Sequence, residues 1–129
     1  MGGIEQNGHH PRVLLIDDDD ELAEVLRQAL RESGYSVATV RHGAAALELV
    51  GQIQPDVILL DLSMPIMDGW SFVTQYRRSA KAGARIVLLT GHPNGREISA
   101  TLGADGYIGK PFELVQLLET LKTQVGATS

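Results

Sequence analysis

Cysteine is absent from this chain, so neither a disulfide framework nor a thiolate metal site can form. That composition fits the reducing cytoplasm, which is the compartment we expect. A surplus of positive charge is also missing, because the formal net charge is −5 at pH 7 and the isoelectric point is near 5.2. An acidic chain lacks the electrostatic footprint of a nucleic-acid binder, and we expect no nucleic-acid binding by this domain.

Long apolar segments are missing as well. The longest runs of valine, leucine and isoleucine hold four residues, at 13–16, 57–60 and 86–89, whereas a membrane-spanning helix needs about 20. The first eleven residues contain no apolar stretch of the kind found in a signal peptide. We therefore expect no membrane association, a flexible tail at 1–11 and a second short tail at 126–129.

What is present suits one globular domain. The chain has 129 residues, of which 43% are hydrophobic, and this is enough to bury a core without covalent cross-links. The three apolar runs are too short for helices and are typical of strands buried on both faces. A weaker alternation at 35–40 and an apolar pair at 107–108 indicate two further strands.

Segments with helical spacing separate these strands. They lie between 22 and 34, over 44–53, from 70 to 76, over about 96–102 and from 112 onward. The helix expected at 96–102 is short. Residues 63–69 are rich in turn formers, and within them we interpret Asp68 and Gly69 as a turn.

The alternation of strands and helices predicts the α/β class, with a parallel five-stranded sheet covered by helices on both faces. Of the two common doubly wound arrangements, we favour the flavodoxin-like (βα)5 sandwich with strand order 2-1-3-4-5. The six-stranded dinucleotide-binding arrangement is disfavoured, because no G-x-G-x-x-G motif follows the first strand.

Polar residues follow the apolar runs at the positions where function is expected. In open α/β sheets, ligands bind beyond the carboxyl ends of the strands, where the strand order reverses. Here the reversal falls between the strands at 13–16 and 57–60. The residues predicted to converge at that edge are Asp17, Asp18, Asp61, Thr90 and Lys110.

The chemistry of this set points to a cation and a phosphoryl group. Three neighbouring carboxylates repel one another unless one is protonated or a cation lies among them. Ligand atoms that are all oxygen favour a hard divalent ion such as Mg²⁺. With a cation on one side and Lys110 on the other, an aspartate can attack phosphorus and form an acyl phosphate.

Four stretches of the sequence together resemble the response-regulator receiver family. They are VLLIDDD at 13–19, LDLSMPIMDG at 60–69, LTG at 89–91 and GADGYIGKPF at 103–112. The resemblance extends from about residue 11 to 125, and we expect the receiver domain to occupy 12–125. Each stretch alone is a weak signal, but four in this order are specific.

The resemblance implies that Asp61 accepts a phosphoryl group from a histidine kinase or a histidine phosphotransfer protein. The cofactor would be Mg²⁺ or Mn²⁺. Asp18 would bind the metal directly and Asp17 partly through water, and Asp61 and the backbone carbonyl of Ser63 would complete the protein ligands. Members of the family catalyse only their own phosphorylation and dephosphorylation, and they control a partner or an attached effector domain.

The same resemblance assigns the remaining roles. Thr90 and Lys110 would bind phosphoryl oxygens, and Tyr107 would be the aromatic switch residue that turns inward when the threonine moves. Ser63 and His92 would modulate the lifetime of the acyl phosphate. The stretch from Thr90 to Lys110 is about two residues shorter than is usual in the family, which agrees with a short helix there.

Several of these residues also have purely structural interpretations. Asp19, Asp20 and Glu21 are best explained as capping residues at the start of a helix. Trp70 is expected to pack rather than bind a ligand. The bond between Lys110 and Pro111 is a candidate cis peptide.

Other functions remain to be compared with the receiver hypothesis. An aspartate-dependent Mg²⁺ phosphatase would need an Asp-x-Asp-x-Thr arrangement after the first strand and a cap domain, and the chain has neither. A flavodoxin-like electron carrier would not place four aspartates, 17–20, beside a flavin phosphate. A receiver-like docking module that is never phosphorylated stays an alternative. Whether the chain is a stand-alone protein or a fragment of a larger one stays open, and so does its oligomeric state.

Overall fold

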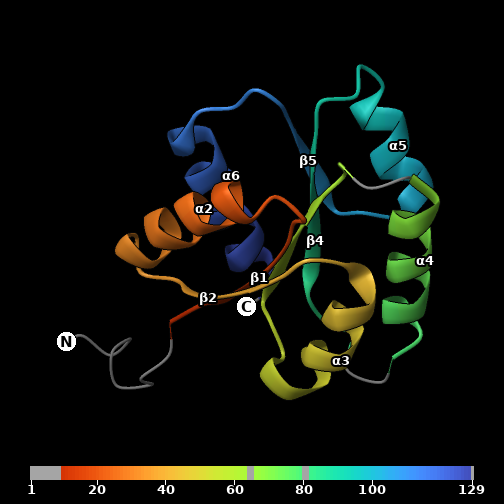
Figure 1. The fold of residues 1–129 in the computed structure, drawn as a ribbon, viewed down its shortest axis with the longest axis horizontal. Coiled ribbons are helices and arrows are strands. Elements are labelled where there is room, and N and C mark those ends of the chain that lie inside the picture. Colours follow the sequence, from red (N-terminus) through yellow and green to blue (C-terminus); the bar gives the residue numbers. More distant parts are fainter. Residues whose placement is uncertain (1–9, 64–65, 80–81, 129) are drawn as a thin grey trace.

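The computed structural model describes residues 10–63, 66–79 and 82–128 (Figure 1). Strands and helices alternate along the chain: β1 (Arg12–Ile16), α2 (Asp20–Glu32), β2 (Ser36–Val40), α3 (Gly43–Ile53), β3 (Val57–Asp61), α4 (Ile66–Arg77), β4 (Arg85–Thr90), α5 (Gly95–Leu102), β5 (Gly106–Gly109) and α6 (Leu114–Thr128). The strands form one parallel sheet in the order β2-β1-β3-β4-β5. The predicted flavodoxin-like, doubly wound fold is confirmed.

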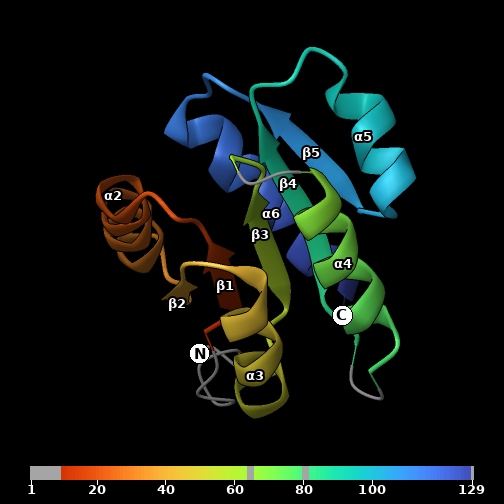
Figure 2. The same ribbon diagram turned by 45° about the vertical axis from the view of Figure 1, so that its right-hand side comes forward.

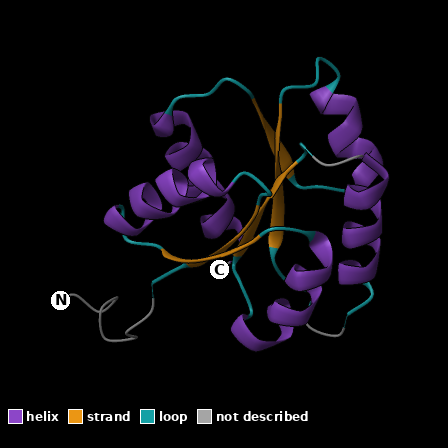
Figure 3. Cartoon of the chain, in the orientation of Figure 1, coloured by secondary structure: helices purple, strands orange, loops and turns teal. Residues whose placement is uncertain are grey.

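The helices cover both faces of this sheet. α2 and α6 lie on one face, and α3, α4 and α5 lie on the other (Figures 1 and 3). The turned view shows α4 and α5 side by side along the second face (Figure 2). Among the helices of the described residues, none has both the length and the apolar character that crossing a bilayer requires.

Two cores result from the period-two alternation of the central strands. In β1, Leu14 and Ile16 face α3 and α4, whereas Val13 and Leu15 face α2 and α6. β3 and β4 alternate in the same way, which is why all their apolar residues are buried. Each such side chain stabilises the fold by about 1.5–3 kcal/mol relative to an exposed one.

The first helix begins where its capping residues predict. The Asp19 side chain accepts a hydrogen bond from the Leu22 N–H at 3.1 Å, and Asp20 and Glu21 occupy the first turn. Negative charge at this end complements the helix dipole, and the positive charge of Arg31 complements it at the other end. The structural interpretation of residues 19–21 is therefore confirmed.

The prediction of a turn at Asp68 and Gly69 is wrong, because both residues lie within α4. Gly69 is buried against the end of β3, where an added Cβ would come within 3.0 Å of Leu62 Cδ2. This close packing of helix on sheet outweighs the turn preference of an Asp-Gly pair. Residues 64–65 of the expected loop lie outside the described residues, and α6 includes residues 126–128 that had been assigned to a tail.

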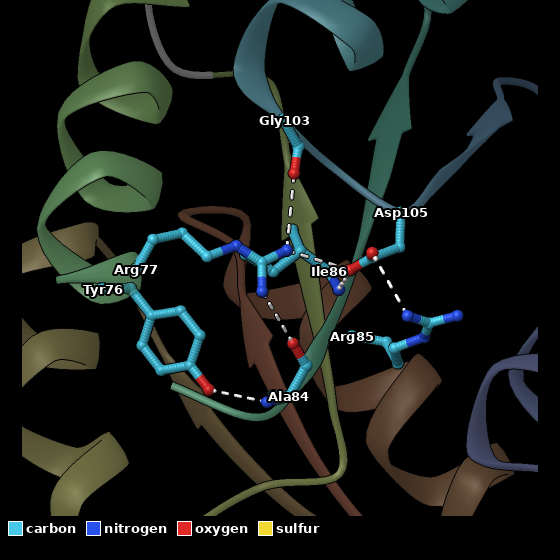
Figure 4. Close-up of polar contacts among 7 residues, drawn as sticks. All are labelled: Tyr76, Arg77, Ala84, Arg85, Ile86, Gly103 and Asp105. Atoms are coloured by element: carbon cyan, nitrogen blue, oxygen red, sulfur yellow. Dashed lines mark hydrogen bonds and ion pairs between the residues drawn. The ribbon is translucent and has the colours of Figure 1, made fainter. Parts of the chain in front are cut away.

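A cluster of polar contacts lies at the amino end of β4 (Figure 4). Asp105, just before β5, accepts a hydrogen bond from the Ile86 N–H at 2.7 Å and one from Arg77 Nη2 at 3.0 Å. The Arg77 guanidinium also donates to the carbonyls of Gly103 and Ala84, at 3.4 Å and 3.3 Å. The last residue of α4 is thereby tied to the segment that joins α5 to β5. We call these contacts the Arg77–Asp105 clamp.

Candidate functional site

The carboxyl ends of β1, β3 and β4 place three polar side chains in the interior of the protein. Asp17 follows β1, Asp61 ends β3 and Thr90 ends β4, with exposed fractions of 2%, 1% and 1%. β1 and β3 are paired in register, with Ile16 opposite Leu60, so the two following residues are neighbours across the strands. Burying two carboxylates side by side is costly unless a cation compensates them.

Lys110 provides one such compensating charge. Its ammonium Nζ lies 2.6 Å from Asp61 Oδ2. The lysine directly follows β5, and its own N–H donates to the Thr90 carbonyl at 2.8 Å, which continues the pairing of β4 with β5. The other carboxylate oxygen of Asp61, Oδ1, accepts the Ser63 N–H at 2.9 Å. Asp61 is thus held on both oxygens by residues from different loops.

The Asp17 carboxyl is in a less favourable position. Its pKa is raised from 3.8 to about 6, chiefly by burial and also by the negative charge of Asp61, although a hydrogen bond from the Asp19 N–H and the charge of Lys110 oppose the shift. That N–H donates to Asp17 Oδ1 at 2.9 Å. Asp17 Oδ2 is buried and has no hydrogen-bond partner among the described residues. A buried carboxylate oxygen without a donor is suited to accept a cation.

Asp18 has a different environment from the two buried carboxylates. It is exposed, and its Oδ1 accepts a hydrogen bond from Ser63 Oγ at 2.8 Å. Within the described residues, no three Asp, Glu, His or Cys side chains already converge in a way that would hold a metal ion. The carboxylates of Asp17 and Asp61 do face each other, and Asp18 lies nearby with its Oδ1 hydrogen-bonded to Ser63. The oxygen-only donor set fits a hard divalent cation.

Thr90 and its neighbours form the other side of the site. Thr90 Oγ1 accepts the His92 N–H at 3.0 Å, so His92 reaches the site through its backbone. Tyr107 lies in β5, opposite Leu88 of β4, and is 40% exposed. The Tyr107 ring and the Thr90 methyl both border Gly95, the first residue of α5. The peptide bond between Lys110 and Pro111 is cis, as predicted from the sequence.

Two hollows flank the buried carboxylates. One, of about 600 Å³, lies between α3 and α4 and is lined by Asp18 and Ser63 together with Arg41, His42 and Phe72. The other, of about 570 Å³, is mainly apolar and lies where α2 meets the start of α6. Lys110 lines that second hollow, together with Val25 and Leu114.

Some polar roles were not predicted from the sequence. His42 caps α3, because its Nδ1 accepts the Ala45 N–H at 3.3 Å, and histidine is not one of the residue types that usually signal a helix cap. Arg41 forms an ion pair with Asp20, which is 21 residues earlier in the chain. Trp70, expected to pack, is 43% exposed at the surface of α4.

Comparison with known proteins gives a consistent result. The model of the response regulator receiver domain matches residues 13–122. The chain is similar to the transcriptional regulatory protein PrrA of Mycobacterium tuberculosis, with 40% identity over 113 residues, which is 87% of this chain and 48% of PrrA. It spans about half the length of the curated relatives it matches.

Solved structures give the same family at high similarity. The chemotaxis response regulator CheY4 of Vibrio cholerae superposes with a TM-score of 0.81 and 30% identity, covering 90% of this chain and 99% of that one. The receiver domain of the sensor histidine kinase PA1611 of Pseudomonas aeruginosa has a TM-score of 0.81 and 28% identity, covering 92% and 99%. That structure contains a magnesium ion coordinated in its active-site cleft.

Proposed function

The chain belongs to the response-regulator receiver family, and on that premise we propose that it accepts one phosphoryl group on Asp61 from a histidine kinase or a histidine phosphotransfer protein. The observation that carries the proposal is the environment of the Asp61 carboxylate. It is 1% exposed, lies next to Asp17 and is paired with Lys110 at 2.6 Å. Such a carboxylate is fixed in direction, and the charge brought by a phosphoryl group would be stabilised by the ammonium beside it.

Asp17, Asp18, Asp61 and the backbone carbonyl of Ser63 would hold the cofactor, Mg²⁺ or Mn²⁺. The unpartnered Oδ2 of Asp17 and the all-oxygen donor set support this assignment. When bound, the ion neutralises charge on the phosphoryl oxygens. A bound cation would also offset the repulsion between the two adjacent carboxylates, which burial strengthens.

Asp61 then acts as the nucleophile. One of its carboxylate oxygens forms a bond to phosphorus while the bond from phosphorus to the donor nitrogen breaks, and the donor imidazole keeps that electron pair. Lys110 stays beside the acceptor and binds a phosphoryl oxygen. The Thr90 hydroxyl accepts the His92 N–H but still has its own hydrogen to donate, and we assign that hydrogen to a second phosphoryl oxygen.

The proposed output is a change of conformation on the side of α5. Movement of Thr90 toward the phosphoryl group would leave room for Tyr107 to turn inward, which converts a local charge event into a change of surface. Ser63, whose N–H donates to Asp61, and His92, whose N–H donates to Thr90, would set how long the acyl phosphate lasts. The receiver domain, 12–125, would act on no substrate but its own acyl phosphate and would work in the cytoplasm.

A partner surface is supported by the apolar hollow beside Lys110. Val25 and Leu114 line it and are 63% and 43% exposed, although both are large aliphatic side chains. Exposed apolar surface next to a reactive group is suited to bind the phosphodonor protein, which has to bring its phosphohistidine to that group. The output would go to a separate partner or to an attached effector domain.

The test is phosphorylation by a small donor. The protein is incubated with acetyl phosphate and Mg²⁺, and its intact mass is measured before and after hydroxylamine. We expect the mass gain of one phosphoryl group, lost in hydroxylamine, and no gain in Asp61→Asn or in the presence of EDTA. A native protein that gains no mass, or an Asp61→Asn variant that gains as much, would refute the proposal.

A further inference from the structure

Gly95 lies where the parts of the proposed switch meet. It is the first residue of α5 and is buried. A Cβ at this position would be 3.0 Å from Tyr107 Cδ2, 3.1 Å from Tyr107 Cε2 and 3.3 Å from Thr90 Cγ2. These distances are shorter than ordinary carbon–carbon contacts of about 3.5–4.0 Å, so an added methyl group would require the Tyr107 ring or the Thr90 methyl to move.

The backbone gives no reason for glycine at this position. Among the described residues, the glycines with positive φ are Gly34 and Gly103, at 100° and 75°. Gly95 has no such angle, and an alanine could adopt its conformation. The reason for a glycine here is therefore the close approach of the Tyr107 ring and the Thr90 methyl to its backbone.

We propose that Gly95 is a positioning residue of the switch, because its missing side chain lets the Tyr107 ring lie against the start of α5 beside Thr90 and turn inward there after phosphorylation. This inference rests on the proposed function of Asp61 and names the residue that makes the response of Tyr107 possible. The contact itself exists in the unphosphorylated protein and can be tested without any phosphoryl group.

The surroundings of Gly95 determine which group has to yield. Thr90 is 1% exposed and is held by two bonds, from the Lys110 N–H to its carbonyl and from the His92 N–H to its Oγ1. The far end of α5 is fixed by the Arg77–Asp105 clamp, through Gly103 and Asp105 (Figure 4). The Tyr107 ring is 40% exposed and is the part that can move outward. An added side chain at 95 is thus expected to displace the ring.

The experiment follows the Tyr107 ring directly. The chain contains three tyrosines, so protein labelled with 3-fluorotyrosine gives three ¹⁹F resonances, and Tyr107→Phe identifies that of Tyr107. In the native protein, acetyl phosphate with Mg²⁺ should shift this resonance. In Gly95→Ala, it should be displaced before phosphorylation and should then stay in place, while intact mass shows the same phosphorylation of Asp61. A merely structural role of Gly95 would not abolish the phosphorylation-dependent shift.

Gly51→Ala is the matched control, because Gly51 lies in α3 and an added Cβ there meets nothing within 4 Å. It should keep the native shift. A Gly95→Ala protein whose Tyr107 resonance matches the native one before and after phosphorylation would overturn the inference. If the native protein takes no phosphoryl group, the proposed function fails. The contact between Gly95 and the Tyr107 ring is then tested only by the shift of the Tyr107 resonance in Gly95→Ala without phosphorylation.

A double-mutant cycle covers the case in which Gly95→Ala folds poorly. The loss of unfolding free energy on Gly95→Ala should be smaller in a Tyr107→Ala background, because the ring that it meets is then absent. An equal loss in both backgrounds would show that the ring is not what the added methyl meets, and the inference would be wrong.

Discussion

Asp18 and Ser63 are joined by a hydrogen bond of 2.8 Å from the serine hydroxyl to the aspartate Oδ1, although 45 residues separate them in the chain. One oxygen of this exposed carboxylate therefore already accepts a hydrogen bond from a neighbouring side chain. A cation that takes this oxygen competes with the serine.

Ser63→Ala should consequently bind Mg²⁺ more tightly. The backbone carbonyl at 63 is unchanged, while the hydrogen bond that has to be broken, worth about 1 kcal/mol, is absent, which corresponds to about fivefold in affinity. Isothermal titration calorimetry with MgCl₂ measures the difference. The control is Ser71→Ala, because the Ser71 hydroxyl accepts a hydrogen bond from the Gln75 side chain within α4. Equal or weaker binding by Ser63→Ala would contradict the competition.

Asp17 gives the site a pH dependence in the absence of metal. Its pKa is raised from 3.8 to about 6 in the folded protein, chiefly by burial, so the folded state binds the proton more tightly than the unfolded state. The contribution of this group to stability is full below pH 4 and is lost as the pH rises to about 6. At one pKa unit per 1.36 kcal/mol, the loss is of the order of 2–3 kcal/mol.

Asp17→Asn should remove that loss. We expect the variant to gain stability over the native protein between pH 4 and pH 6.5 and to keep the difference at pH 7.5. Urea unfolding in EDTA at these pH values measures it. A constant difference across the range would exclude Asp17 as the titrating group.

Lys110→Met tests the pair with Asp61 while keeping an apolar stem. It should lower the unfolding free energy by about 1–3 kcal/mol, since a buried carboxylate loses its counter-ion, although the lysine side chain is itself 29% exposed. The same change in an Asp61→Asn background should have a clearly smaller effect. Equal effects in the two backgrounds would mean that Lys110 stabilises the protein through contacts other than Asp61.

The Arg77–Asp105 clamp predicts two different outcomes at one position. Asp105→Asn keeps an oxygen for the Ile86 N–H and should destabilise the protein by about 1 kcal/mol, whereas Asp105→Ala leaves that N–H unpaired and should cost about 2–3 kcal/mol. Urea unfolding of both variants gives the comparison. If the two variants are equally stable, the hydrogen bond to Ile86 is not what the carboxylate provides.

The sheet and the buried part of the site follow from patterns that one sequence displays. Runs of four aliphatic residues require strands buried on both faces, and the parallel order then brings the residues after these strands to a single edge. Asp17, Asp61 and Lys110 were predicted to meet for that reason, and the structure places them together. Topology alone carries this part of the prediction.

Other features depend on packing that no local pattern encodes. The Asp68–Gly69 pair has the composition of a turn, but it lies within α4, where Gly69 packs closely against Leu62. The bond between Asp18 and Ser63 depends on the orientation of two side chains. Arg77 and Asp105 are 28 residues apart and meet because α4 and β5 lie against the same strand, β4.

The position of the clamp on β4 has a consequence for how this domain can vary. The clamp holds the first residues of the strand, and the proposed phosphoryl site includes its last residue, Thr90, so the two are separated by the length of a six-residue strand, roughly 15 Å. Changes at sites that far apart add independently. A stronger clamp can therefore offset the cost of destabilising substitutions around Asp61, and the surroundings of this residue can vary without loss of the fold.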